Sequence, residues 1–239
     1  MHDTIQPLSW DTDYLGFRVG QIRRASTGGL VPVQDLVHQA RQQGYRLLYW
    51  FMAPEDLVTS EALLAEGGVL ADRKIRIALP LQAEQTHQLP PGIHPTTQFS
   101  PELQALAVQA GEHSRFRTDT RFSPEVSGRL YVEWLRRSLL GELAREVLVY
   151  QPHPTEPATG LLILGEKNNR TEMILMAVEA AQRGRGIGAA FIEAARCRAS
   201  AWGHSTVQLV TQATNPACRL YTREGFVLEQ EEHVYHLWL

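Results

Sequence analysis

Cysteine is scarce in this sequence, and no stretch of it concentrates charge of one sign. The 239 residues include two cysteines, Cys197 and Cys218, whose spacing fits neither a metal site nor a disulfide framework. Lys and Arg number 23 against 26 Asp and Glu, for a net charge of −3 without a basic tail. Since nucleic acid is bound through concentrated positive charge, we expect no nucleic-acid partner. We also expect a reducing compartment and no bound metal.

Long hydrophobic runs are also missing. No apolar stretch approaches the roughly 18 residues that span a membrane. The first ten residues, "MHDTIQPLSW", lack the basic and then apolar pattern of a secretion signal. The overall composition, 44% hydrophobic and 21% charged, is typical of globular proteins. These absences predict a cytoplasmic protein with no membrane partner.

The first eighty residues read as alternating strands and helices, followed by a polar segment rich in proline. The residues 82–95, "QAEQTHQLPPGIHP", show no periodicity and are the best linker in the sequence. We therefore expect a small N-terminal α/β domain over 1–81, a linker over 82–95 and a second domain over 96–239. The elements expected in the first domain are strands at 17–25, 45–52 and 73–81 and helices at 33–43 and 53–68.

The second domain reads as a mixed α+β fold. It begins with a helical segment at 101–111 and a polar segment at 112–129 that we expect to be a loop. A glycine-rich turn then follows three consecutive strands. The further elements expected are a helix at 130–140, strands at 146–151, 160–166 and 171–178, the glycine turn with its helix at 184–202, a strand at 206–211, a helix at 216–224 and a strand at 226–238.

The glycine turn "QRGRGIGAAF", residues 182–191, can bind an anion. Free backbone N–H groups converge where a glycine-rich bend enters a helix, and the helix dipole adds partial positive charge. A Walker loop is excluded because Gly188 is followed by two alanines rather than Lys and Ser or Thr. A dinucleotide-binding turn is excluded by its glycine spacing and by the lack of a carboxylate about twenty residues on. On the turn alone, phosphate binding and a ligand-free bend both stay open.

Downstream residues favour a ligand for this turn. A strand ending "MAV", the motif R-x-x-G-x-G and the segment "NPACRLYTREGF" occur in that order. This arrangement resembles the GNAT superfamily of N-acetyltransferases. The resemblance implies a splayed central mixed sheet, preceded here by the smaller domain, and acetyl-CoA as cosubstrate.

The same resemblance implies roles for particular residues. A splayed strand would pair with the pantetheine arm, the glycine turn would wrap the pyrophosphate, and Tyr221 would be the catalytic proton donor to the thiolate. The Val178 N–H would donate a hydrogen bond to the oxyanion of the tetrahedral intermediate. Asn215 precedes Tyr221 by six residues rather than the family's seven, which leaves Thr214 as an alternative contact. The residues implied in cofactor binding are Met176, Ala177, Val178, Arg183, Gly184, Arg185, Gly186, Ile187, Gly188, Ala189 and Asn215.

The acceptor is suggested by four further segments. "LSWDTDYLGF", "SRFRTDTRFSP", "SGRLYVEWLRRSLLGE" and "TVQLVTQATN" resemble the TDP-fucosamine acetyltransferases. The implied partner is a small-molecule amine, a nucleotide-linked amino-dideoxy sugar such as dTDP-4-amino-4,6-dideoxyhexose. Arg115 and Arg117 would bind it through their guanidinium groups. The alternatives are that Arg115 caps neighbouring carbonyls, that another amine (a protein N-terminus, a polyamine or an antibiotic) is the acceptor, or that the chain binds acetyl-CoA without turnover. A homodimer is compatible with the sequence.

The general base stays open at this stage. Glu172 lies early on the strand that leads to the cofactor, Glu112 and His113 flank the expected acceptor loop, and His233 and His236 lie on the last strand. A water relay without a dedicated base is an equal alternative.

Overall fold

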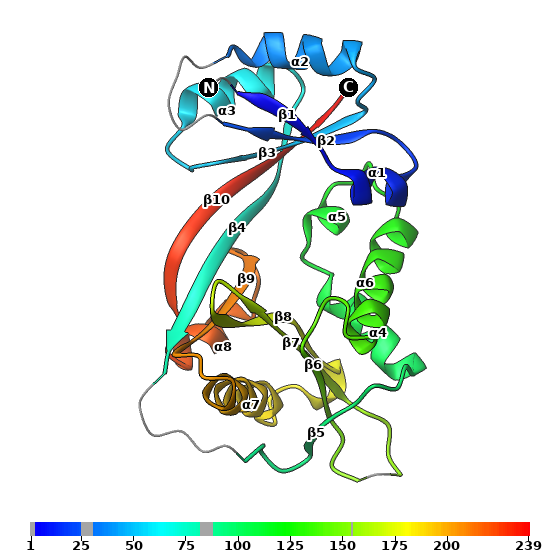
Figure 1. The fold of residues 1–239 in the computed structure, drawn as a ribbon, viewed down its shortest axis with the longest axis vertical. Helices are drawn as coiled ribbons and strands as arrows, with labels where there is room; N and C mark the ends of the chain where they lie inside the picture. Colours follow the sequence, from blue (N-terminus) through cyan, green and yellow to red (C-terminus); the bar gives the residue numbers. More distant parts are fainter. Residues whose placement is uncertain (1–2, 25–30, 82–87, 154) are drawn as a thin grey trace. The chain divides into compact units, whose positions relative to one another are not determined.

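The computed structural model describes residues 3–24, 31–81, 88–153 and 155–239. The chain divides into two compact units, residues 1–74 with Glu231–Leu239 and residues 75–230. Two long strands, β4 (Val69–Pro80) and β10 (Val227–Trp238), contribute residues to both units (Figure 1). The division departs from the boundaries expected from sequence, because 75–95 belongs to the second unit and 231–239 to the first. The expected linker lies outside the described residues at 82–87, and its end forms β5 (Ile93–Pro95).

The first unit is an α/β unit with strand order β1-β2-β3-β10. β2 and β3 pair in parallel, while β1 and β10 pair antiparallel with their neighbours. The sequence reading missed the first strand and helix of this unit. Its elements are β1 (Thr4–Pro7), α1 (Ser9–Leu15), β2 (Val19–Arg23), α2 (Val33–Gln42), β3 (Leu47–Met52) and α3 (Leu57–Ala65), with the first part of β4 and the end of β10.

One face of β3 carries the core of this unit. Leu48, Trp50 and Met52 alternate along the strand and pack with the apolar stripe of α2. Tyr235 and Leu237 of β10 join the same cluster. The last residues of the chain therefore complete the core of the N-terminal unit.

The second unit has strand order β4-β9-β8-β7-β6-β5, with helices on both faces of the sheet (Figure 1). Phe191 of α7 belongs to the same buried cluster as Leu162 and Leu164 of β7, while α4 contacts β7 and β8. The expected mixed α/β fold class is confirmed. The elements are the end of β4, β5, α4 (Pro101–Ala110), α5 (Arg115–Thr118), α6 (Pro124–Leu139), β6 (Glu146–Tyr150), β7 (Gly160–Lys167), β8 (Arg170–Val178), η1 (Ala180–Gln182), α7 (Ile187–Ala201), β9 (Thr206–Gln212), α8 (Cys218–Arg223) and the start of β10.

The expectation of a loop over 112–129 was wrong, because α5 and the first turns of α6 lie there. α6 begins in the same way as α4, the helix before this segment. Ser100 and Ser123 each accept a hydrogen bond from the backbone N–H three residues on, and a proline follows each serine. A serine cap followed by proline at the first helical position is a strong helix start. The segment "SPEV" at 123–126 therefore carried the same signal as "SPEL" at 100–103.

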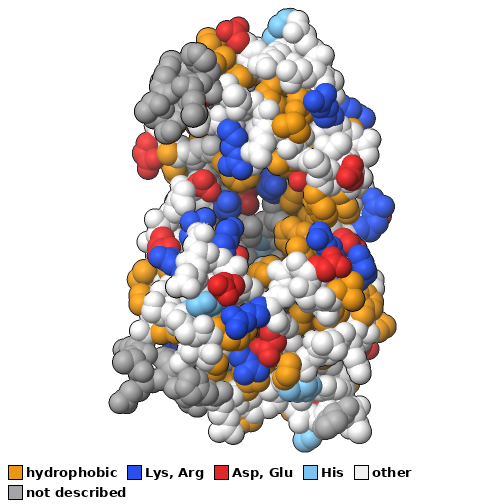
Figure 2. Space-filling view, in the orientation of Figure 1, with side chains coloured by type: hydrophobic (Ala, Val, Ile, Leu, Met, Phe, Trp, Pro, Cys, Tyr) orange, Lys and Arg blue, Asp and Glu red, His pale blue; other side chains and the backbone are white. Residues whose placement is uncertain are grey.

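The described residues include no helix that is long and apolar enough to cross a membrane. Basic and acidic side chains are interspersed on the face seen in Figure 2, as the small net charge predicts.

Candidate functional site

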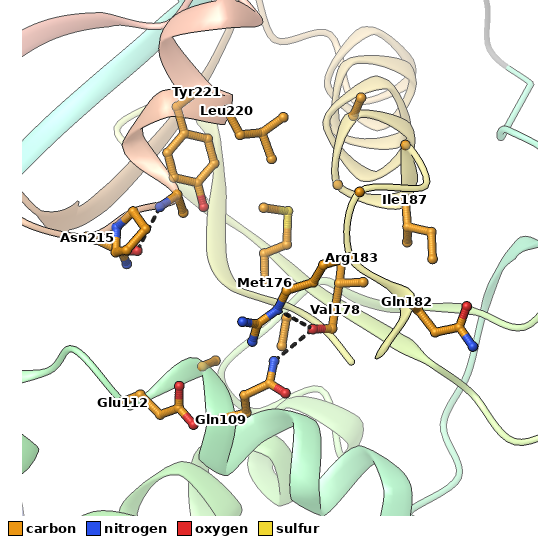
Figure 3. Close-up of a pocket in the computed structure, with 18 of the residues that line it drawn as sticks. Gln109, Glu112, Met176, Val178, Gln182, Arg183, Ile187, Asn215, Leu220 and Tyr221 are labelled. Carbon is orange, nitrogen blue, oxygen red and sulfur yellow. Dashed lines mark hydrogen bonds between the residues drawn. The ribbon is translucent and has the colours of Figure 1, made fainter. Parts of the chain in front are cut away.

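A cavity of about 470 Å³ in the second unit brings together the end of β8, the glycine turn and α8 (Figure 3). The last turn of α4 and the residues after it supply a further wall. The described residues that line this cavity are Gln109, Ala110, Glu112, His113, Met176, Ala177, Val178, Gln182, Arg183, Gly184, Gly186, Ile187, Gly188, Ala189, Asn215, Pro216, Ala217, Leu220, Tyr221 and Arg223.

The cavity lies where two parallel strands separate. β8 and β9 pair from Thr171–Val207 to Met173–Leu209, and the ladder ends there. β8 runs on to Val178, still paired with β7 on its other edge. The register between β7 and β8 shifts next to Leu164, where a bulge gives β8 one extra residue. Residues 174–178 therefore have an edge that no described residue of β9 covers.

The backbone of Val178 faces that open edge. Its carbonyl oxygen accepts hydrogen bonds from Gln109 Nε2 at 2.9 Å and Arg183 Nε at 3.2 Å (Figure 3). The next N–H, that of Glu179, donates instead to Thr159 O at 2.9 Å, beside the start of β7. Successive residues of a strand direct their backbone groups to opposite edges. The N–H groups of Met176 and Val178 are consequently available at the open edge.

The glycine turn exposes backbone donors without side chains above them. Gly184 and Gly186 have φ values of +78° and +85°, which favour glycine, and an added Cβ at either would meet no heavy atom within 4 Å. α7 starts at Ile187, and Ala190 N–H is the donor that bonds back to Gly186 O, at 2.9 Å. The N–H groups of the first helical turn therefore point out of the helix end. Such a turn fits a bound anion.

Tyr221 is held almost completely inside the unit, with 7% of its surface exposed. Its ring meets Phe226 edge-on, with centroids 5.6 Å apart. Burial, and to a lesser degree the nearby Cys218, raises the pKa of the Tyr221 phenol well above its usual range. The phenol is therefore a proton donor, not a phenolate, at neutral pH.

The turn before α8 is organised by Asn215. Its Oδ1 accepts from Ala217 N at 3.0 Å, and its Nδ2 donates to Thr211 Oγ1 at 3.1 Å. Asn215 lines the cavity, whereas Thr214 is not among the described residues that do. Cys218 donates to Gln212 O at 3.4 Å, and burial raises the pKa of its thiol, so the thiol rather than the thiolate is present at neutral pH.

Most residues singled out from the sequence meet at this cavity, and a few do not. Every residue expected to bind the cofactor lines it except Arg185, which is exposed on the turn. Arg115 and Arg117 do not line it either. They lie on α5, with the Arg115 guanidinium 4.6 Å from the Phe116 ring centroid.

Two of the candidates for the general base lie at the cavity. Glu112 and His113 line the cavity, whereas Glu172, His233 and His236 are not among its described lining residues. Gln109 and Leu220 also line it and were missed in the sequence. Gln109 carries no motif, and only its contact with Val178 O distinguishes it from other surface glutamines.

Residues 146–228, all in the second unit, match the family model of the acetyltransferase (GNAT) domain. The second unit carries a GNAT acetyltransferase domain. That domain is an acyltransferase domain of the GNAT type, and the GNAT family uses acetyl-CoA.

Relatives of this chain extend the similarity beyond that domain. The dTDP-fucosamine acetyltransferase of Escherichia coli O6:H1 is 26% identical over 227 residues, which cover 95% of this chain and 94% of that protein. The spore coat polysaccharide biosynthesis protein SpsD of Bacillus subtilis is 31% identical over 134 residues, 56% of this chain and 45% of SpsD. A GCN5-related N-acetyltransferase from Sphaerobacter thermophilus shares the fold, with a TM-score of 0.58, 15% identity and coverage of 92% of this chain and 72% of that one.

Proposed function

We propose that this chain transfers the acetyl group of acetyl-CoA to the amine of a nucleotide-linked amino-dideoxy sugar, such as dTDP-4-amino-4,6-dideoxyhexose. The observation that carries the proposal is the single cavity shared by the open edge of β8, the glycine turn and the buried Tyr221.

The residues of the cavity fit acetyl-CoA. A diphosphate fits the glycine turn, where backbone N–H groups converge and the two positive-φ glycines leave the space above them open. Arg183 and Arg185 add positive charge to the same turn. An extended pantetheine arm carries amides that can pair with the free edge at Met176–Val178, as an added strand would. Asn215 Nδ2 uses one proton in its hydrogen bond to Thr211, and its second proton can reach the pantetheine arm.

Tyr221 and Val178 supply the chemistry of transfer. Acetyl-CoA, when bound, brings an electrophilic thioester to the site. The Val178 N–H, directed at the open edge, would stabilise negative charge on the carbonyl oxygen during attack by the amine. Tyr221, protonated because it is buried, would give its proton to the departing sulfur.

The acceptor is inferred from the relatives and from basic residues. One relative is named as an acetyltransferase of a dTDP-linked amino sugar, and another as a protein of polysaccharide biosynthesis. We place the nucleotide phosphates of the acceptor at Arg115 and Arg117, since guanidinium groups bind phosphate bidentately.

Thiol release from acetyl-CoA, measured with a panel of amines, tests the proposal. We expect turnover with dTDP-4-amino-4,6-dideoxyhexose and little with spermidine or a peptide with a free N-terminus. Turnover confined to the cationic amines would refute the sugar acceptor but not the acetyltransferase. If acetyl-CoA showed no binding in calorimetry, the whole site assignment would be wrong.

Replacing Arg115 and Arg117 together with alanine tests the acceptor site. The variant should raise the sugar-nucleotide KM roughly 10-fold or more, given about 1.5–3 kcal/mol for a hydrogen bond to a charged group, and leave the acetyl-CoA KM nearly unchanged. The matched control replaces Arg136 and Arg137, which carry the same charge at the end of α6 and lie outside the cavity lining. Equal effects of the two double variants on the sugar-nucleotide KM would mean that only overall charge matters.

A further inference from the structure

The last turn of α4 and the residues after it form the wall of the cavity that faces Tyr221. Gln109, Glu112 and His113 line this side, while Tyr221 reaches the cavity from α8 (Figure 3). The sequence offered Glu112 and His113 only as two of several candidates for the general base, and no motif marks Gln109. Its position makes it the side from which an amine can approach a thioester held at the edge of β8.

Two contacts fix this segment in place. Gln109 Nε2 donates to Val178 O at 2.9 Å, which ties the end of α4 to the end of β8. Gly111 is buried directly under the ring of Tyr131 on α6, where an added Cβ would come within 2.3 Å of a ring carbon. The chain can take this path only with glycine at position 111. Glu112 and His113 follow at once and are therefore held relative to both β8 and α6.

Glu112 is the one carboxylate among the described residues that line the cavity. The other ionisable side chains there are His113, Arg183, Arg223 and Tyr221, of which the two arginines repel a cation. An ammonium group that enters the cavity is attracted to the carboxylate and to no other charge in this lining. Figure 3 shows Glu112 on the opposite side of the cavity from the Tyr221 hydroxyl.

We propose that Glu112 holds the ammonium of the acceptor and takes its proton, which makes it the general base opposite Tyr221. This role rests on the acetyl transfer proposed above. The ammonium gives one proton to Glu112, and the freed lone pair forms the N–C bond as the C–S bond breaks. Tyr221 protonates the sulfur, and the second nitrogen proton leaves through water, which restores the phenol. Glu112 releases its proton to solvent.

Glu112→Gln keeps the shape of the side chain and removes its charge and basicity. At about pH 7, kcat/KM for the amine should fall about 100-fold, the lower end for general-base catalysis. The loss should shrink as the pH rises through the pKa of the amine itself, about 8 for an α-amino group, because a neutral amine needs no base. The acetyl-CoA Kd from calorimetry should stay unchanged.

Glu102→Gln is the matched control, since Glu102 is an exposed carboxylate on α4, the helix that precedes Glu112, and does not line the cavity. It should behave as wild type. His113→Gln tests the neighbouring imidazole. A pH-dependent loss in His113→Gln, with Glu112→Gln close to wild type, would overturn the assignment, as would a Glu112→Gln loss of equal size at every pH.

The outcome for Glu112 is separable from the identity of the acceptor. The comparison uses whichever amine of the panel the wild type turns over fastest. If that amine is spermidine, the sugar proposal fails, and Glu112 is judged on its own variant-to-wild-type ratio. If it is the sugar nucleotide and Glu112→Gln shows no loss, only the role of Glu112 is refuted.

Discussion

Among single residues, Tyr221 has the environment that a proton donor requires. Burial raises its pKa, so the neutral phenol persists across the range in which the enzyme would work. A group with a raised folded pKa stabilises the fold below its unfolded pKa, here about 10, and that contribution is lost as the pH rises further. Because the phenol also keeps its proton in this range, Tyr221 should produce no alkaline fall in activity below about pH 10.

Tyr221→Phe separates packing from proton donation. The ring and its contact with Phe226 remain, so acetyl-CoA affinity should change little. The turnover number kcat should fall by roughly 10²–10⁴-fold because the thiolate loses its acid. Steady-state kinetics with calorimetry measure both quantities. An unchanged kcat would show that water protonates the sulfur.

Asn215 acts on its neighbours as well as on the cavity. Its Oδ1 accepts a hydrogen bond from Ala217 N and so closes the turn that leads into α8, which carries Tyr221. Asn215→Ala should cost about 0.5–1.5 kcal/mol of folding stability, as the loss of one hydrogen bond does, and should lower kcat. Asn215→Asp keeps the acceptor oxygen and should recover most of the stability. Thermal unfolding measures these changes, and an unchanged Tm in Asn215→Ala would exclude the role of Asn215 in this turn.

At the level of secondary structure, the glycine turn and α7 form one anion site. The turn depends on glycine for its backbone conformation at 184 and 186, and α7 supplies free N–H groups. The sequence motif located this element closely. The range 184–202 was expected to hold the glycine turn and its helix, and the helix starts at Ile187, directly after the turn.

Gly186→Glu tests the anion site, and its control is a second glycine with the same backbone conformation. The carboxylate would occupy the space of the diphosphate and repel it, so acetyl-CoA binding should disappear in calorimetry. Gly203→Glu is the control, because Gly203 has φ +77° and open surroundings and lies outside the cavity lining. Both variants should lose about 1–3 kcal/mol of stability from backbone strain. Equal losses of binding in both would mean that strain alone is responsible.

In the whole chain, each unit has its own core, and the first unit is built from both ends of the sequence. β10 pairs with β3 from His233–Met52 to Trp238–Leu47, and its Tyr235 and Leu237 are buried with α2. A fragment of residues 1–81 lacks this strand. The edge of β3 and part of the core would then be open.

Residues 1–81 alone should therefore fail to fold, although the sequence marks them as a domain. Residues 1–74 joined through a flexible linker to 231–239 should fold, because the missing strand is restored. Chemical-shift dispersion in NMR spectra of the two fragments distinguishes them. A dispersed spectrum for 1–81 would show that the C-terminal strand is dispensable.

The sequence by itself determined the elements whose signals are local. Glycines at 184 and 186 and the alternating strands identify their elements because the cause lies within a few residues. The resemblance of "MAV", R-x-x-G-x-G and "NPACRLYTREGF" then indicated the family. Of the residues in these motifs that it assigned to the cofactor or to catalysis, all but Arg185 line one cavity.

The tertiary structure alone decided what depends on distant residues. Gln109 and Glu112 belong to the cavity because α4 packs on β8 and Gly111 lies under Tyr131, contacts that span sequence separations no local pattern encodes. The last strand joins the first unit because β3 has an edge to pair and apolar residues to cover. Strand pairing and burial act between segments far apart along the chain, so only the folded chain shows which segments they join.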